Sequence, residues 1–370
     1  MKVLICWSHI SGYMAACWRA LIQHASVDLF VLARASGGQT AQTSFQSGIM
    51  QGIPCELLPS DGAIDHKVVQ RIIEQQKPDI IVINGWHTPA YVRIPTMKGA
   101  ENARMIMAMD TPYLGTFRQN YGRYIMKRYF SKIDRVFVTG ERCWMLAKIL
   151  GFPERIIRRG VYGVDFQMLS TLHAVRSARP GGWPKRFLYT GRYAEEKALD
   201  VLLEGYSIYR RSVPDPWPLT CCGQGPLQNL VRAQEGVEDR GFVQPKDLRD
   251  VLLEAGVFVL ASRFDPWPLV IVESCAAGLP IVCSEACGSR VELVRSSYNG
   301  FTCETGNAES LAEGLVYMHE RYDRLPAMGL GSRALAEPYS QLMWVDRWVT
   351  CFNELTPRTS RTPVSTGASA

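Results

Sequence analysis

The chain has 370 residues, of which 47% are hydrophobic and 21% are charged, and its formal net charge is +6. At about 150 residues per domain this length predicts two domains, and the apolar content excludes a disordered chain. No window approaches the roughly 18 consecutive apolar residues of a membrane-spanning helix. The apolar run at the start is also too short for a signal peptide and lacks a small-residue cleavage site.

Charge and cysteine content restrict the partners and the compartment. Residues 1–165 contain 20 Lys and Arg against 12 Asp and Glu, so the basic character lies in the first half. Because aromatic residues do not alternate with the basic ones in any repeated register, we expect no nucleic-acid partner. An anionic substrate or an anionic membrane surface explains the charge as well. The eleven cysteines, odd in number and without repeated spacing, indicate reduced thiols of a cytoplasmic protein and no zinc site.

Short apolar strands alternate with helical stretches along the chain, as in parallel α/β sheets. The first half predicts helices such as 15–24 and 68–75 between strands at Lys2–Cys6, Val27–Leu32, Ile80–Ile83, Met105–Met109 and Arg135–Val138. The second half predicts strands at Arg186–Thr190, Pro218–Cys222, Val257–Leu260 and Pro280–Cys283. Their nearly continuous apolar character favours strands buried on both faces, in two doubly wound Rossmann-like domains.

The domain boundaries follow from Pro and Gly content. The run Pro180-Gly181-Gly182 and nearby Pro184 are typical of a linker. We predict an N-terminal domain over 1–165, a linker over 166–185 and a C-terminal domain over 186–338. Helical periodicity returns over 339–355, with one apolar stripe at Leu342, Val345, Val349 and Phe352. The Ser/Thr/Pro/Ala-rich residues 356–370 predict a disordered tail.

The most informative window follows the strand that ends at Leu260. A Pro-rich loop carries Asp265, and the next helix is predicted to begin at Pro268 and to carry Glu273 about one and a half turns inside. Such carboxylates line the crevice at the strand ends, where open α/β sheets bind ligands. Free amides of Trp267, Leu269 and Val270 at the helix start suit a phosphate. A loop and helix with ordinary surface acids explains this window alone equally well.

Two earlier windows carry weaker signals. Arg192 and Lys197 follow a strand. The planar guanidinium of an arginine beside the ammonium of a lysine suits a diphosphate, although exposed cations in loops are usually only solvated. The runs Gly223-Gln224-Gly225 and Gly241-Phe242-Val243 follow further strands, where glycine permits close approach of a ligand or of another backbone.

The order of these windows is more specific than any one of them. Gly-Arg…Lys, Gly-x-Gly-Pro-Leu, Gly-Phe-Val, Ser-Arg-x-Asp-x7-Glu and Gly-Leu-Pro occur in succession over about 90 residues. Together they resemble glycosyltransferase family 4, the retaining nucleotide-sugar transferases of the GT-B fold. Upstream, Gly163-Val164-Asp165 looks like the Asn-Gly-Val-Asp that precedes the hinge in that family, and 339–355 resembles its returning helix. The resemblance is tight over 186–305 and looser over 1–165.

The resemblance implies a role for each motif residue. Arg192 and Lys197 would neutralise the donor diphosphate and stabilise it as leaving group, and Glu273 would bind the ribose hydroxyls. Asp265 stands where the family has a Glu that touches the donor sugar. Amides around Leu269 and Val270 would hold phosphate oxygens, and the base would lie beside Phe242 and Val243. No metal or other cofactor is implied, and the donor would be a UDP-, GDP- or ADP-sugar.

The sequence departs from the pattern of family 4 at two places near the expected donor sugar. Asp265 is one methylene shorter than the family's usual Glu. The usual Gly-Phe-Gly is replaced by Pro266-Trp267-Pro268, which removes two amide donors.

The N-terminal domain is expected to hold the acceptor. Its first turn contains His9, Ser11 and Gly12, of which Gly12 is expected to approach the donor and the other two the acceptor, together with His87 and Tyr113. We hypothesise that Asp110, at a strand end, orients the acceptor hydroxyl and balances positive charge developing on the sugar. His87, also at a strand end, is the rival for this role, and a capping role for Asp110 or a structural role for His87 stays open.

Residues 117–135 carry six cations against one acid, Asp134, with the aromatic residues Tyr121, Tyr124, Tyr129 and Phe130 among them. On a helix they suit an anionic membrane or an anionic acceptor, although a solvated helix face explains them too. The cysteines predict a cytoplasmic protein, and peripheral contact with the inner membrane face is one interpretation of 117–135.

The function expected from the sequence is sugar transfer from a nucleotide-diphosphate donor to a hydroxyl of a glycan, lipid-linked or small-molecule acceptor. Two alternatives stay open, a nucleotide-sugar 2-epimerase of the same fold and a non-catalytic nucleotide-sugar-binding subunit. A nicotinamide dehydrogenase is disfavoured, because no Gly-x-Gly-x-x-Gly follows the first strand.

Overall fold

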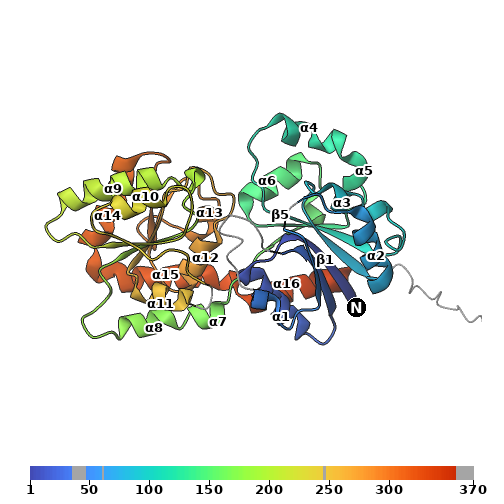
Figure 1. Cartoon of the computed structure of the whole chain (residues 1–370), viewed down its shortest axis with the longest axis horizontal. Helices are drawn as coiled ribbons and strands as arrows, with labels where there is room; N and C mark the ends of the chain where they lie inside the picture. Colours follow the sequence, from blue (N-terminus) through green and yellow to red (C-terminus); the bar gives the residue numbers. More distant parts are fainter. Residues whose placement is uncertain (36–46, 61, 245–246, 356–370) are drawn as a thin grey trace, which may run out of the picture.

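The computed structural model describes residues 1–35, 47–60, 62–244 and 247–355. Two sheets lie side by side, each with helices packed against it (Figure 1). All strand pairs in both sheets are parallel, as predicted from the buried apolar strands. The predicted tail 356–370 lies outside the described residues.

The first sheet has seven strands in the order β3-β2-β1-β4-β5-β6-β7. Its strands are β1 (Lys2–His9), β2 (Asp28–Arg34), β3 (Cys55–Leu58), β4 (Ile80–Asn84), β5 (Arg104–Met109), β6 (Arg135–Val138) and β7 (Ile157–Arg159). The five predicted strands are confirmed to within three residues at each end. β3 and β7 were not predicted, because a short strand at a sheet edge needs no continuous apolar run.

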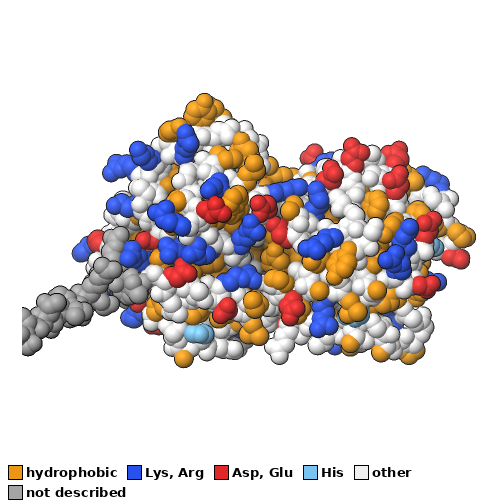
Figure 2. All heavy atoms as spheres, turned by 180° about the vertical axis from the view of Figure 1, so that it is seen from behind, with side chains coloured by type: hydrophobic (Ala, Val, Ile, Leu, Met, Phe, Trp, Pro, Cys, Tyr) orange, Lys and Arg blue, Asp and Glu red, His pale blue; other side chains and the backbone are white. Residues whose placement is uncertain are grey.

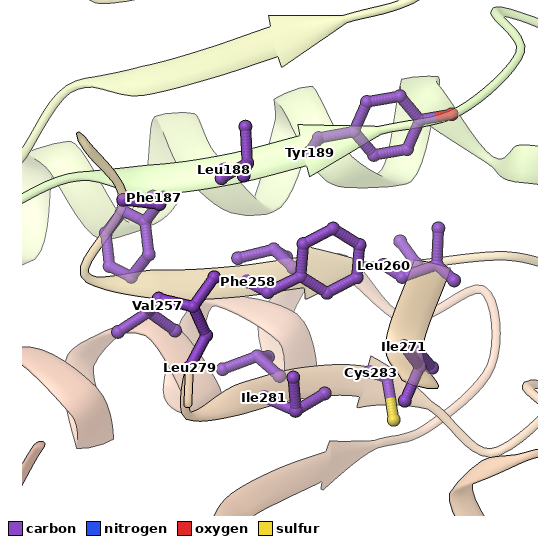
Figure 3. Packing of buried hydrophobic residues seen from close by; sticks show 14 of the residues in the cluster. Phe187, Leu188, Tyr189, Val257, Phe258, Leu260, Ile271, Leu279, Ile281 and Cys283 are labelled. Atoms are coloured by element: carbon purple, nitrogen blue, oxygen red, sulfur yellow. The ribbon is translucent and has the colours of Figure 1, made fainter. Parts of the chain in front are cut away.

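The second sheet has six strands in the order β10-β9-β8-β11-β12-β13. Its strands are β8 (Phe187–Thr190), β9 (Leu219–Cys222), β10 (Val237–Asp239), β11 (Val257–Leu260), β12 (Ile281–Ser284) and β13 (Gly300–Cys303). Again the two strands that were not predicted, β10 and β13, are the edge strands. In Figure 3 the apolar side chains of β8, β11 and β12 pack together with Ile271 of the adjoining helix α12 (Leu269–Ala276).

Helices flank both sheets. Around the first sheet lie α1 (Gly12–Ile22), α2 (His66–Gln76), α3 (Pro89–Val92), α4 (Phe117–Ile125), α5 (Lys127–Phe130), α6 (Glu141–Ile149) and α16 (Gln341–Glu354). Around the second lie α7 (Phe166–Leu169), α8 (Leu172–Ser177), α9 (Leu199–Ser212), α10 (Gln228–Ala233), α11 (Leu248–Glu254), α12, α13 (Arg290–Leu293), α14 (Ala308–Glu320) and α15 (Leu325–Ala336). No helix of the described residues is long and apolar enough to cross a bilayer. All eleven cysteines are free thiols, ten of them buried.

The last helix, α16, returns to the first sheet. Its Trp344 and Trp348 are buried, and the Trp348 ring stacks on Phe137 of β6 at a centroid distance of 4.0 Å. A backbone bridge between Val164 and Ser340 joins the two places where the chain passes between the sheets. Leu342, expected on the buried stripe of this helix, is instead 68% exposed, because it lies at the start of the helix beyond the apolar cluster.

The segment 166–185, expected to be a linker, is packed into the second domain over much of its length. It contains α7 and α8, and the Arg176 side chain on α8 is fully buried. The Arg176 guanidinium donates to the carbonyls of Leu252, Ala277 and Gly278 and lies over the Trp183 ring. The Pro and Gly run therefore bends a chain that is already part of this domain.

We expect Arg176→Ala to destabilise the protein by about 3 kcal/mol, because three buried carbonyls lose their donor. Burial lowers the pKa of Arg176 to about 9, because the charged guanidinium is removed from water. The measurement is the thermal melting temperature at pH 7, with Arg179→Ala, an exposed neighbour, as control. Equal melting of the two variants would contradict this account.

Candidate functional site

Both sheets reverse their strand order at one point, between β1 and β4 in the first and between β8 and β11 in the second. At such a point the loops that follow the two neighbouring strands run to opposite sides of the sheet. They leave a crevice beyond the carboxyl ends of the strands, where ligands bind in doubly wound folds. His9 lies at the end of β1 and His87 follows β4. Arg192 follows β8 and Asp265 follows β11.

These strand ends face one pocket of about 600 Å³ between the two domains. Its lining from the first domain comprises Trp7, Ser8, His9, Ile10, Ser11, Tyr13, Asn84, His87, Thr88, Asp110 and Tyr162. Its lining from the second comprises Thr190, Gly191, Arg192, Lys197, Cys222, Gly223, Phe242, Val243, Leu248, Leu260, Asp265, Trp267, Pro268, Leu269 and Val270.

Most residues singled out in the sequence thus come together. The pocket contains His9, Ser11, His87, Asp110, Arg192, Lys197, Phe242, Val243, Asp265, Leu269 and Val270. Gly12, at the start of α1, and Glu273, in the second turn of α12, are not among its lining residues. Tyr113 lines a neighbouring pocket instead.

Arg192 and Lys197, the two cations predicted to bind the diphosphate, each have a carboxylate partner. Lys197 Nζ lies 2.5 Å from Asp265 Oδ2, and the two side chains are only 16% and 11% exposed. Arg192 Nη2 lies 2.5 Å from Glu196 Oε1 at a more exposed site. Burial raises the pKa of Asp265, although the neighbouring Lys197 opposes that rise. Asp265 therefore holds Lys197 in the pocket, a role that the sequence did not indicate.

The start of α12 differs in one respect from the expected phosphate site. The Trp267 N–H donates to the Asp265 carboxylate, so it is not free for a ligand. The amides of Leu269 and Val270 open α12, and the structure gives them no acceptor among the described residues. Gly278, with φ of +71°, ends the helix as predicted, because this left-handed conformation favours glycine.

Glu273 is a partly buried carboxylate that forms no hydrogen bond or ion pair with any described residue. Burial alone raises its pKa to about 7. Burial chiefly, with the charges of Asp110 and Glu273 contributing, also raises the pKa of Tyr13 to about 12. Because the charge of Glu273 acts on Tyr13, and Tyr13 lines the pocket, Glu273 lies near the pocket without lining it.

The acceptor-side candidates lie on the opposite wall. Tyr162 donates its hydroxyl to Asp110 Oδ2 at 2.7 Å, which fixes the carboxylate. Burial and the positive charge of Arg118 lower the pKa of His87, so the imidazole is neutral at pH 7. Both Asp110 and His87 are in place to meet a hydroxyl, and both lie at the pocket.

Several features of the pocket were not predicted from the sequence, among them the side chains of Tyr162, Thr190 and Trp267; of Trp267 only the backbone amide was predicted to take part. Tyr162 and Thr190 are buried among apolar neighbours, and Thr190 Oγ1 has no hydrogen-bond partner among the described residues. Trp267 is buried against the apolar cluster of the first domain, although it belongs to the second. A β-carbon at Gly140 would overlap the Trp267 ring, so the glycine makes room for this contact.

The described residues contain no group of three or more His, Cys, Asp or Glu that could hold a metal ion.

Comparison with known proteins relates the second domain to enzymes of one kind. The sequence profile of the family described as Glycosyl transferases group 1 matches residues 184–321. The chain is 28% identical over 169 residues to an uncharacterized glycosyltransferase of Haemophilus influenzae, which covers 44% of this chain and 48% of that protein. It is 30% identical over 177 residues to the putative teichuronic acid biosynthesis glycosyltransferase TuaC of Bacillus subtilis, which covers 47% and 44%. The chain thus spans about half the length of these curated relatives.

The fold as a whole resembles a solved structure, that of Anabaena HepE in complex with UDP and glucose. The TM-score is 0.72 at 15% sequence identity, and the match covers 96% of this chain and 100% of HepE. At this identity the likeness shows the fold. The predicted GT-B fold, with two Rossmann-like domains facing each other across a pocket, is confirmed.

Proposed function

We propose that this chain is a metal-independent, retaining glycosyltransferase that moves a sugar from a nucleotide diphosphate to an acceptor hydroxyl in glycan or glycolipid biosynthesis. The observation that carries the proposal is the pocket between the domains, where Arg192 and Lys197 lie beside the open amides of α12. Retention and metal independence come from the resemblance to family 4 given above.

The donor half of the pocket has the groups that a sugar nucleotide needs. Arg192 and Lys197 supply positive charge where the diphosphate would lie, and the amides of Leu269 and Val270 supply hydrogen-bond donors. Glu273 does not line the pocket itself, but it lies near Tyr13, which does, and it would supply an acceptor for ribose hydroxyls. Cleavage of the glycosyl–phosphate bond leaves the electron pair on the diphosphate, and fixed cations there stabilise the transition state more than the ground state.

A nucleotide-sugar screen tests the proposal. Purified protein is expected to melt at higher temperature with one of UDP-, GDP- or ADP-sugars, because a ligand that binds only the folded state stabilises it. Transfer or slow hydrolysis of that donor should then be detected, and Arg192→Ala should weaken both. No stabilisation by any of the three nucleotide classes would overturn the proposal, and donor conversion to another sugar nucleotide would favour the epimerase.

Asp110→Asn is expected to lower transfer by about 10²- to 10⁴-fold while the donor-induced rise in melting temperature is kept. The amide oxygen of Asn still accepts from Tyr162, so the geometry stays and only the charge is lost. His87→Gln, measured beside it, separates the two candidates for the acceptor hydroxyl. Full transfer in Asp110→Asn together with loss in His87→Gln would assign the role to His87.

We also propose that the protein contacts an anionic membrane surface through 117–135. On α4 the buried residues are Gln119 and Gly122, whereas the exposed stripe is apolar and consists of Phe117, Tyr121, Tyr124 and Ile125. Exposed cations flank it at Arg118, Arg123, Lys127, Arg128 and Lys132. Figure 2 shows Lys and Arg gathered over this domain. Arg135, Tyr129 and Phe130 do not belong to this surface, because Arg135 pairs with Glu354 and the two rings are buried.

Co-sedimentation with liposomes tests this contact. Binding is expected to rise with the fraction of anionic lipid and to fall with salt, since each surface cation contributes about 1 kcal/mol. Phe117→Glu should weaken it, whereas Leu342→Glu, an equally exposed residue on α16, should not. Binding that ignores the lipid charge would contradict the proposal.

A further inference from the structure

A second pocket, of about 310 Å³, lies between the two domains beside the first. It is lined by Pro112, Tyr113, Leu114, Arg142, Met145, Phe264, Asp265 and Ala286. The first five residues belong to the N-terminal domain and the last three to the C-terminal domain. We call it the side pocket.

The side pocket is apolar and open. Leu114, Met145 and Phe264 are 51%, 53% and 42% exposed, although they come from three separate segments of the chain. Its cation, Arg142, donates to the Glu285 carbonyl at 2.9 Å. Large apolar side chains that gather at one place and stay exposed mark a contact site for an apolar ligand.

The side pocket lies between the pocket of about 600 Å³ and the surface of α4. Asp265 lines both pockets, so they meet at this side chain. On the other side, the Leu114 N–H donates to Gln119 of α4 at 2.7 Å, and the Tyr113 hydroxyl donates to Asn120 at 2.8 Å. The rim of the side pocket therefore continues into the helix whose exposed stripe is apolar.

We propose that the side pocket binds the hydrocarbon part of the acceptor, so that the acceptor is an amphiphile such as a lipid-linked sugar. Its reacting hydroxyl lies near Asp110, and its chain lies against Leu114, Met145 and Phe264 and leaves over α4. The inference rests on the proposed glycosyl transfer and narrows its acceptor class.

A photoreactive probe tests the occupant directly. The probe is hexyl β-D-glucoside with a diazirine on the end of the hexyl chain, the sugar serving only as a soluble head group. Irradiation is expected to label peptides that contain 112–114, 145 or 264. Each methylene buried gives about fourfold tighter binding, so unlabelled hexyl glucoside should suppress labelling at a concentration at least tenfold below that of methyl glucoside.

The matched variants are Met145→Glu in the side pocket and Leu230→Glu, an apolar residue of α10 with 48% exposure. Labelling should fall at least tenfold in the first and stay unchanged in the second, and melting temperatures show that both fold. Labelling spread over other peptides, equal competition by the methyl glucoside, or unchanged labelling of Met145→Glu would overturn the inference. The nucleotide-sugar screen on the unmodified protein fails separately if the proposed function is wrong.

Discussion

Lys197→Met is expected to reduce transfer by about 10²- to 10³-fold, the usual effect of removing one group that stabilises developing negative charge. It should also destabilise the fold by about 3 kcal/mol, because Asp265 is left buried without its partner. Two readouts check this, the rate of transfer below the melting transition and the melting temperature itself.

The double variant Lys197→Met/Asp265→Asn separates the two effects. Replacing both members of a buried ion pair costs far less stability than removing one, so most of the melting temperature should return. Transfer should not return, because the positive charge at the diphosphate is still missing. Lys185→Met, an exposed lysine of the same domain, is the control. If the double variant regained transfer, Lys197 would serve only to neutralise Asp265.

Glu273→Gln is expected to stabilise the protein and to weaken donor binding. In the native state burial holds the pKa of this carboxyl at about 7, against an ordinary value of 4.5. The native state therefore keeps a proton that the unfolded chain releases, and above pH 7 the buried charge destabilises the native state by about 3 kcal/mol. At pH 8 the variant should melt higher than the unsubstituted protein.

The pH dependence gives the sign of this effect. Below about pH 4.5 the carboxyl is protonated in both the folded and the unfolded chain, so the difference between the two proteins vanishes there. The difference grows as the pH rises to about 7 and is constant beyond. Glu204→Gln on α9 removes the same charge from an exposed site and should show no such trend.

Whereas Glu273→Gln is expected to raise the melting temperature, it is expected to lower the affinity for the donor. A charged acceptor of hydroxyl hydrogen bonds contributes about 1.5–3 kcal/mol, so Glu273→Gln should weaken the donor by about 10- to 100-fold. A residue kept only for packing would not combine a higher melting temperature with weaker binding. If Glu273→Gln lowered the melting temperature and left donor affinity unchanged, the assignment to ribose would be wrong.

The sequence predicts the sheets well where strands are buried on both faces, because such strands are continuous apolar runs. It does not predict β3, β7, β10 and β13, since edge strands lack that signal. The Pro and Gly run near residue 181 indicates a bend but not that Arg176 is already buried before it. That burial depends on carbonyls more than 70 residues away.

The candidate site shows the same limit. The motifs predict which side chains gather at the strand ends, since parallel strands carry their carboxyl ends to one edge. They do not predict the pairs Lys197–Asp265 and Tyr162–Asp110, which join residues 68 and 52 positions apart. Which partner a charged group finds is decided by the packed fold, and the pairing sets what the group can do.

The returning helix α16 has a consequence for how the protein is made. A ribosome has synthesised β6 some two hundred residues before Trp348 exists to cover Phe137. The apolar face of the N-terminal sheet that α16 covers therefore stays exposed until the whole C-terminal domain has been synthesised, because that domain lies between β7 and α16 in the sequence. Truncation before residue 341 would leave that face bare in the finished product, so the domain that is begun first is completed last.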